Sequence, residues 1–318
     1  YFGVSGWRCM KRFAIYRRLL DGQIKLRVVD NASSNLINAC WSANETVSLD
    51  AADITAHIAQ EFCIEAGESI ILLGASEDQS SAYRQYPNRH VELNIIVCPV
   101  IIDGEVIPLY FCVLGLVFGK CGAVLNYNRY SCALFVFNAR ILAVLGSNYF
   151  DDFLVEEPAF ASHSGPSCVR EMHRLLRIAL DSGKSEDLCM FFQFLGLLND
   201  SSHMSDHDAE FLVSICTKRQ AALIAEIDQI IAEGVLPSGK ASKFAGRSNF
   251  CLSWLFQRVG ACALHPIRAR QYAPAGTSDK LDDALISALN FLRVVFTILP
   301  QRRVPCKPIP YDEPGVVF

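Results

Sequence analysis

Two adjacent aspartates stand inside an apolar, aromatic run, in the stretch SNYFDDFLVEE at residues 147–157. A buried carboxylate without a partner is strongly disfavoured, so Asp151 and Asp152 require either water or a bound cation. Strand-like residues flank the pair on both sides, which predicts a hairpin with the aspartates at its tip. The pair is therefore either a solvated turn or a set of ligands for a divalent cation.

The front of the chain alternates between strand and helix patterns. Extended, β-branched residues predict a strand in KLRVVDN (25–31), and SIILLGASED (69–78) predicts a short strand that ends in carboxylates. Capping residues and a final glycine predict a helix in ETVSLDAADITAHIAQEFCIEAG (45–67). Asp103-Gly104 is a two-residue turn between β-rich arms, which predicts a further hairpin.

Longer apolar segments follow. The segment AVLNYNRYSCALFVFNARILAVLG (123–146) predicts a buried helix that ends at Gly146, residues 166–180 predict another helix, and MFFQFLGLL (190–198) predicts one strand. From Asp206 onward the pattern is helical. The sequence therefore predicts an α+β front two-thirds and a helical back third.

Composition argues against several classes of protein. The most apolar stretch, residues 106–127, has an uncharged run of 14 residues before Lys120, short of the roughly 20 that a membrane-spanning helix needs. No charged segment followed by an apolar one opens the chain, so we expect no signal peptide. The thirteen cysteines include no Cys-x-x-Cys pair, which indicates reduced, buried thiols in an intracellular protein, cytoplasmic or nuclear. Histidines cluster in HMSDHDAE (203–210). This cluster favours a polar loop that precedes a helix, and a zinc site is the less favoured alternative.

Charge is distributed unevenly along the chain. Residues 1–30 have a net charge of +5, residues 31–216 of −14, and residues 217–307 of +7. Two basic ends that flank an acidic middle indicate a basic binding surface beside a carboxylate-rich site. Ordinary variation of surface charge is the alternative interpretation.

Phosphoryl transfer by two metal ions requires carboxylates from separate strands to converge on one point. Asp78 ends a predicted strand, and Asp151 and Asp152 occupy the predicted hairpin tip. If those strands are neighbours in one sheet, three carboxylates meet, and a bound cation makes such a cluster tolerable.

The segments around these aspartates, taken in order, resemble the motifs of reverse transcriptases. KLRVVDN (25–31) resembles the fingers strand, and DQSSAYRQYP (78–87) resembles motif A. LGLVFG (114–119), with the following AVLNYNR, resembles motif B, and YFDD (149–152) resembles motif C. GKSED (183–187) and FLGL (194–197) resemble two later palm segments. The agreement extends over about residues 20–300. The chain is most similar to retrotransposon enzymes of the LTR or DIRS kind.

The resemblance implies a right-hand polymerase of the α+β class. Fingers and palm, with an antiparallel sheet, would interleave in residues 1–200, with a palm core at about 70–87 and 115–200. A helical thumb or connection region would occupy residues 201–300, and a proline-rich linker with the truncated start of a following domain would occupy 301–318. An RNase H-like domain often follows in this family, so we expect one downstream in a full-length protein.

Roles for individual residues follow from the same resemblance. Asp78, Asp151 and Asp152 would be catalytic and bind two Mg²⁺, with Mn²⁺ as an alternative. Tyr83 would be the steric gate that excludes a ribose 2′-hydroxyl, and a core tyrosine is the competing interpretation. The remaining nucleotide contacts would come from the triphosphate ligands Lys25 and Arg27, from Phe118 and Gly119 beside the incoming nucleotide, and from Lys184 near the leaving pyrophosphate.

Basic residues in the helical back third repeat on one predicted helix face. Lys240, Lys243, Arg247 and Arg258 recur at offsets of 3, 7 and 18 residues, which places them on one side at 3.6 residues per turn. Such a face contacts nucleic-acid phosphates without reading sequence. A merely solvated basic face explains the spacing equally well.

The chain also departs from the family pattern. Val117 stands where a proline is common in motif B, and Gln79 and Ser80 occupy motif A positions that are usually apolar and basic. Two hypotheses remain open. The chain is an RNA-directed DNA polymerase core of a retroelement polyprotein, which extends a primer on an RNA or DNA template with deoxynucleoside triphosphates, or it is a catalytically inactive nucleic-acid-binding remnant of the same fold. A membrane protein is disfavoured.

Overall fold

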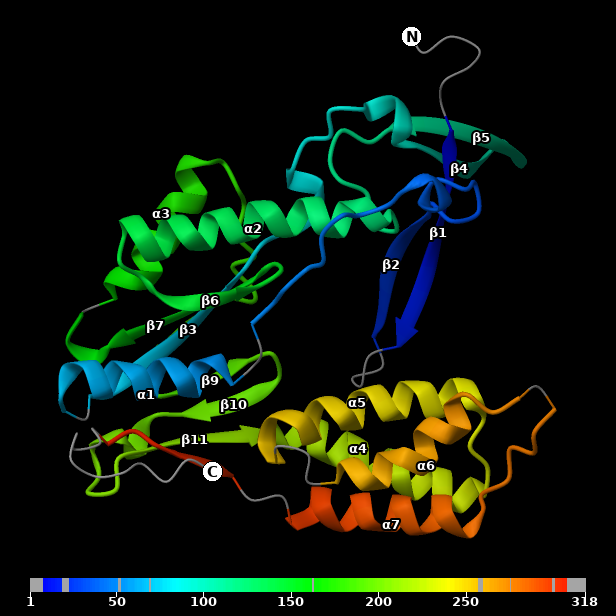
Figure 1. Ribbon diagram of the computed structural model, residues 1–318. Coiled ribbons are helices and arrows are strands. Elements are labelled where there is room, and N and C mark those ends of the chain that lie inside the picture. Colours follow the sequence, from blue (N-terminus) through cyan, green and yellow to red (C-terminus); the bar gives the residue numbers. More distant parts are fainter. Residues whose placement is uncertain are drawn as a thin grey trace. The chain divides into compact units, whose positions relative to one another are not determined.

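A computed structural model (Figure 1) describes residues 8–18, 23–50, 53–68, 70–161, 163–256, 260–274, 276–298 and 301–307. The chain divides into two compact units. Unit 1 comprises Tyr1–Leu49, Glu77–Phe153 and Ser167–Ser185, and unit 2 comprises Asp50–Ser76, Leu154–Pro166 and Glu186–Phe318. Each unit is therefore assembled from segments that are distant in the sequence.

Unit 1 contains a four-stranded sheet in the order β2-β1-β4-β5. Strand β1 (Cys9–Arg18) pairs antiparallel with β2 (Ile24–Asn31) and parallel with β4 (Ile95–Ile102). Strands β4 and β5 (Glu105–Cys112) form the predicted hairpin. Its turn residues Asp103 and Gly104 adopt φ values of 51° and 83°, the left-handed conformations that a two-residue hairpin turn favours.

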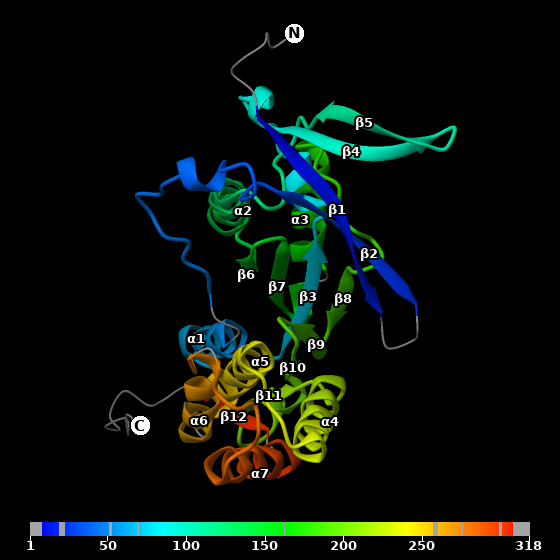
Figure 2. The same cartoon turned by 90° about the vertical axis from the view of Figure 1, so that its right-hand side faces the viewer.

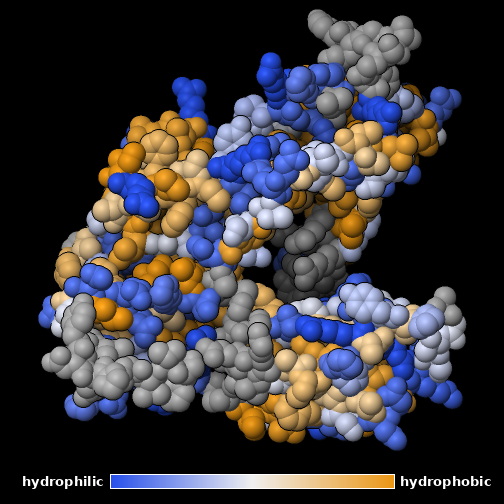
Figure 3. Space-filling view, in the orientation of Figure 1, coloured by the Kyte–Doolittle hydropathy of each residue, from blue (hydrophilic) through white to orange (hydrophobic). Residues whose placement is uncertain are grey.

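The long helix of unit 1, α2 (Cys121–Ile141), ends earlier than the sequence predicts. Ala143 adopts a φ of 54°, and the N–H of Val144 bonds back to the carbonyl of Asn138 at 3.0 Å, which terminates the helix before Gly146. The helix is also buried on one face only, at Ala123, Tyr127, Asn128, Ser131, Leu134 and Asn138. Apolar side chains accordingly reach the surface over α2 and α3 (Ser164–Leu175), as Figure 3 shows.

A second sheet has the order β6-β7-β3-β8, and Figure 2 shows its strands side by side. Strands β6 (Leu145–Tyr149) and β7 (Asp152–Pro158) are the predicted hairpin around the aspartate pair. Strand β3 (Leu72–Asp78) is the predicted strand that ends in carboxylates, and β8 (Glu186–Cys189) pairs antiparallel with it.

Unit 2 contains a sheet that the sequence predicts only in part. Its order is β12-β11-β10-β9, with all neighbours antiparallel. The predicted single strand at 190–198 is a hairpin of β9 (Phe191–Phe194) and β10 (Leu197–Asp200), because Leu195 and Gly196 form a turn with φ values of 49° and 77°.

Two further strands of this sheet replace a predicted helix and a predicted linker. Strand β11 (Glu210–Ile215) lies where the sequence suggested the start of a helical region, and β12 (Arg302–Pro305) lies in the proposed proline-rich linker. The two strands pair with each other, for example Phe211 with Val304. These two strands are about ninety residues apart, so local patterning could not reveal this pairing. Residues 308–318 lie outside the described part.

The helices of unit 2 agree with the sequence predictions better than its strands do. Helix α1 (Ile54–Ala66) ends at Gly67 as predicted, and α4 (Thr217–Glu233), α5 (Ser238–Phe256), α6 (Ala261–Gln271) and α7 (Asp283–Ile298) form the helical back third. Short 3₁₀ turns occupy Asn38–Cys40, Ala82–Gln85, Val91–Leu93, Ala159–Ala161 and Ser202–Ser205.

Two expectations from composition can be compared with these elements. Across the described ranges, no helix combines the length and the apolar character that crossing a membrane would require. All thirteen cysteines are free thiols, as predicted, but only Cys63, Cys251 and Cys306 are buried, so the prediction of generally buried thiols is wrong.

Candidate functional site

The candidate site lies in unit 1, where β3 ends at Asp78. The side chain of Asp78 is 13% exposed. Its backbone carbonyl accepts a hydrogen bond from the N–H of Asp181 at 2.8 Å, and the N–H of the next residue, Gln79, donates to the carbonyl of Asp151 at 3.1 Å. These two bonds hold the end of β3 beside the β6–β7 turn and beside the loop that contains Lys184.

The β6–β7 turn has a strained and well-supported shape. Phe150 adopts a φ of 54°, a conformation that costs a non-glycine residue on the order of 1–3 kcal/mol. Its carbonyl accepts a hydrogen bond from the hydroxyl of Ser131 on α2, and the side-chain amide of Asn148 donates to the same hydroxyl at 2.9 Å. The tip is therefore held in a defined geometry, and Asp151 and Asp152 on it are only partly exposed.

The three predicted aspartates interact electrostatically. Burial raises the pKa of Asp152 to about 7, and the charge of Asp151 and a hydrogen bond with Asp78 contribute next. Burial also raises the pKa of Asp151, with a further contribution from the charge of Asp78. Asp78 therefore lies close enough to both Asp151 and Asp152 for its charge to disfavour their ionised forms.

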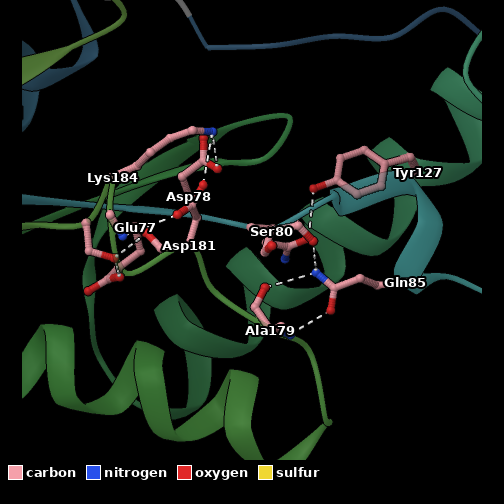
Figure 4. A network of polar contacts seen from close by, with 11 residues as sticks. Glu77, Asp78, Ser80, Gln85, Tyr127, Ala179, Asp181 and Lys184 are labelled. Carbon is pink, nitrogen blue, oxygen red and sulfur yellow. Dashed lines mark hydrogen bonds and ion pairs between the residues drawn. The ribbon is translucent and has the colours of Figure 1, made fainter. Parts of the chain in front are cut away.

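Lys184 supplies a positive charge beside Asp78 (Figure 4). Its Nζ atom lies 2.7 Å from Oδ1 of Asp78 and 3.7 Å from Oδ2 of Asp181. The hydrogen bond with Asp78 is the main reason that the pKa of Lys184 is raised. The neighbouring buried carboxylate of Glu77 is bound separately, by Arg170 and by the hydroxyl of Ser185 at 2.6 Å.

Magnesium is the ion that the sequence resemblance implies here, and the donor chemistry suits it because Mg²⁺ prefers carboxylate oxygens. The raised pKa values also mark a cluster whose repulsion a cation would relieve. Among the residues that the structure describes, however, no group of three or more His, Cys, Asp or Glu is placed so that it could hold a metal ion. The donor set thus fits the ion, while the side chains do not form a three-ligand arrangement.

The histidine cluster at 203–210 also lacks the arrangement of a metal site. His203 pairs with Asp206 at 2.8 Å and His207 pairs with Asp208 at 3.2 Å. The segment precedes strand β11, and the predicted helix after it is absent. These side chains form exposed local pairs.

Tyr83 packs between two aromatic rings close to the aspartates. Its ring lies 4.4 Å from that of Tyr127, nearly parallel at 16°, and 4.4 Å from that of Phe118, tilted at 40°. Burial raises the pKa of Tyr83 to about 12, and the charge of Asp151 adds to the shift. At 7% exposure, Tyr83 is compatible both with a gate in the nucleotide pocket and with a core tyrosine.

Gly119 lies where the segment LGLVFG (114–119) meets β2. It has a φ of 102°, and a Cβ atom there would lie 2.0 Å from the carbonyl oxygen of Asp30, so only glycine fits. Asp30 itself is buried and binds Arg12 through two hydrogen bonds, of 2.6 and 2.9 Å. The predicted triphosphate ligands Lys25 and Arg27 are on β2, opposite Arg17 and Ile15, but their side chains lie outside the described part of the structure.

The basic residues of α5 belong to unit 2 and are partly neutralised. Lys240 pairs with Glu233 of α4 at 2.9 Å, and Arg247 binds Glu226 of α4 through both carboxylate oxygens. Lys243 is exposed. Arg258 lies outside the described residues. The predicted basic face is thus interrupted by acids from the neighbouring helix, which spacing along one helix cannot reveal.

Three residues close to this site have no role that the sequence predicts. Gln79 departs from the family pattern, and the resemblance implies no role for Tyr127 or His173. The structure buries all three in one polar network behind Asp78. The available signal was an amide at a position where an apolar residue was expected.

Comparisons with known proteins agree with this architecture at the level of structure alone. No protein-family model and no curated protein matches the sequence. The foamy viral protease-reverse transcriptase dRH in complex with double-stranded DNA has a similar structure, with a TM-score of 0.61 and 13% identity, over 91% of this chain and 44% of that chain.

Two related structures are also similar. The foamy viral protease-reverse transcriptase in complex with an RNA/DNA hybrid matches with a TM-score of 0.57 and 12% identity, over 91% of this chain and 33% of that chain. Its complex with double-stranded DNA matches with a TM-score of 0.55 and 12% identity, over 90% of this chain and 51% of that chain. The chain thus spans between a third and about half of these proteins, and it has the mixed α+β, polymerase-like fold of reverse transcriptases.

Proposed function

We propose that this chain is the polymerase core of an RNA-directed DNA polymerase from a retroelement of the LTR or DIRS kind. It would add deoxynucleotides to a primer 3′ end on an RNA or DNA template. The observation that carries the proposal is the meeting of Asp78 with Asp151 and Asp152, at a strand end and a strained turn, in a reverse-transcriptase-like fold. An RNase H-like domain would follow in the full-length protein.

The chain's own residues supply the following parts of the chemistry. Asp78, Asp151 and Asp152 would hold Mg²⁺, which when bound stabilises the attacking and leaving oxygens of an in-line displacement. Lys184, which is paired with Asp78, would supply an ammonium group that pairs with the phosphates of the incoming nucleotide. Tyr83 and Phe118 would supply an aromatic surface against which the sugar packs.

A catalytically inactive nucleic-acid-binding remnant is the second candidate function. Two observations favour it. The described residues contain no ready three-ligand metal arrangement, and Lys184 already neutralises Asp78. Under this proposal the fold would bind a primer–template duplex without extending it.

Primer extension distinguishes the two candidates. The wild-type protein, Asp151→Asn and the exposed control Asp208→Asn would be assayed with a labelled primer on RNA and DNA templates, in Mg²⁺ or Mn²⁺, with duplex binding measured in parallel. Extension by the wild type and the control, with a loss of at least about a hundredfold in Asp151→Asn, would support the polymerase. Binding without extension by the wild type would support the remnant, and an absence of binding would contradict both.

A further inference from the structure

A buried polar network lies directly behind the candidate site and is centred on Gln79. This residue follows Asp78 and is 1% exposed. Its side-chain oxygen Oε1 accepts hydrogen bonds from the hydroxyls of Tyr86 at 3.1 Å and Tyr127 at 2.9 Å. Its Nε2 atom lies 3.0 Å from Nε2 of His173. A buried amide is costly unless such partners exist, and here each end of the amide has one.

The direction of these hydrogen bonds is fixed by the far end of the network. Nδ1 of His173 lies 2.8 Å from the carbonyl of Val169, so Nδ1 carries a proton and donates it. Burial lowers the pKa of His173, which favours the neutral ring, and Nε2 of that ring is then an acceptor. Gln79 must therefore turn its NH₂ toward His173 and its oxygen toward the two tyrosines.

The two tyrosines connect Gln79 to Tyr83, the predicted sugar gate. Tyr127 stacks on Tyr83, and Tyr86 meets Tyr127 edge-on, with ring centroids 5.3 Å apart. The charge of Asp151 contributes to the raised pKa of both Tyr83 and Tyr127, after burial, so both hydroxyls lie within its electrostatic reach. The backbone N–H of Gln79 binds the carbonyl of Asp151 as well. One residue therefore contacts both the aromatic stack and the aspartate turn.

We propose that Gln79 is a positioning residue that sets the ring of Tyr83, through Tyr127, relative to Asp151, and thereby sets the discrimination between deoxyribonucleotides and ribonucleotides. The inference rests on the polymerase function proposed above. It explains why an amide stands at a position where the resemblance predicts an apolar residue. The amide is the shared acceptor of two buried hydroxyls, and an apolar side chain would leave both without it.

Loss of that acceptor has a defined structural consequence. Tyr127 is also within hydrogen-bonding reach of the side chain of Ser131, which holds the carbonyl of Phe150 in the strained turn. Without Gln79, the hydroxyl of Tyr127 would shift toward Ser131 to avoid remaining unpaired. The ring of Tyr127 would tilt with it, and Tyr83, stacked on that ring, would follow.

Single-nucleotide incorporation on a primer–template tests the inference. The ratio of kcat/KM for a deoxyribonucleotide to that for the matching ribonucleotide would be measured for wild type, Gln79→Leu, Tyr127→Phe and the double variant. Gln60→Leu, on α1 in unit 2, is the matched control. We expect the ratio to fall about tenfold in Gln79→Leu, mainly through KM, with unchanged primer–template affinity. Tyr127→Phe should lower it in the same direction.

The double variant separates positioning from a general loss of structure. Removal of both partners leaves no Tyr127 hydroxyl that could shift toward Ser131, so Gln79→Leu with Tyr127→Phe should recover part of the ratio that Gln79→Leu loses. If Gln79→Leu does not fold, Tyr127→Phe decides alone, because it keeps the ring and its stack.

The possible results distinguish this inference from the proposed function. An unchanged ratio in both single variants, with an active wild type, overturns the inference alone. A loss of kcat for both nucleotides by the same factor also overturns it, because that result indicates general damage. A wild type that incorporates neither nucleotide overturns the proposed function and this inference with it.

Discussion

Asp152→Asn should stabilise the metal-free protein above neutral pH. In the wild type, Asp152 has a pKa of about 7 in the folded state, against an ordinary value of 3.8, because of burial, the charge of Asp151 and the hydrogen bond with Asp78. The folded state therefore holds a proton that the unfolded state has lost, so stability falls as pH rises from about 4 to 7. An asparagine has no charge to bury and can still donate a hydrogen bond to Asp78.

The size of the effect follows from the shift. Each pKa unit corresponds to about 1.4 kcal/mol, so a rise from 3.8 to about 7 sets an upper bound of about 4 kcal/mol on the destabilisation at pH 8, which solvent around this partly exposed side chain reduces. The Asp152→Asn variant should escape this loss, and its advantage over the wild type should grow between about pH 4 and pH 7 and then stay constant.

Urea unfolding in a chelator, at several pH values from 5 to 8, measures this difference directly. Asp208→Asn is the control, since that carboxylate is 79% exposed and distant in sequence from the cluster. Added Mg²⁺ should raise the stability of the wild type at pH 8 more than that of Asp152→Asn. A variant no more stable than the wild type at pH 8, or an advantage that does not depend on pH, would refute the assignment of a repelling carboxylate cluster.

Three further predictions concern neighbouring residues. Tyr83→Ala should relax discrimination against ribonucleotides in primer extension while deoxynucleotide incorporation stays measurable, and unchanged discrimination would make Tyr83 a core residue. Gly119→Ala should destabilise unit 1 by more than about 2 kcal/mol, because the φ of residue 119 is 102° and the new Cβ would meet the carbonyl of Asp30. Thermal or urea unfolding measures this loss, and an unchanged free energy of unfolding would contradict the backbone geometry. Lys184→Gln should lower metal-free stability at pH 8, because it removes the cation bonded to Asp78, and a stabilised variant would show that the lysine does not compensate the cluster.

Much of the candidate site could be predicted from short stretches of sequence. Asp78 at the end of β3 and the aspartates on the β6–β7 turn follow from strand patterning and from charge inside an apolar run, because these signals depend on adjacent residues. The hairpin at Asp103-Gly104 and the end of α1 at Gly67 were predicted for the same reason. The meeting of the three carboxylates was a hypothesis that required the strand order.

The sequence by itself determined the local elements and the chemistry that they carry, and the tertiary structure decided which of them meet. Strand β12 pairs with β11 across about ninety residues, and Lys240 and Arg247 pair with acids of α4, which no helical period encodes. The orientation of Gln79 depends on Tyr86, Tyr127 and His173, from separate parts of the chain. A buried amide is stable only where donors and acceptors from elsewhere in the chain bond to it. Only the folded protein therefore explains why Gln79 occupies this position.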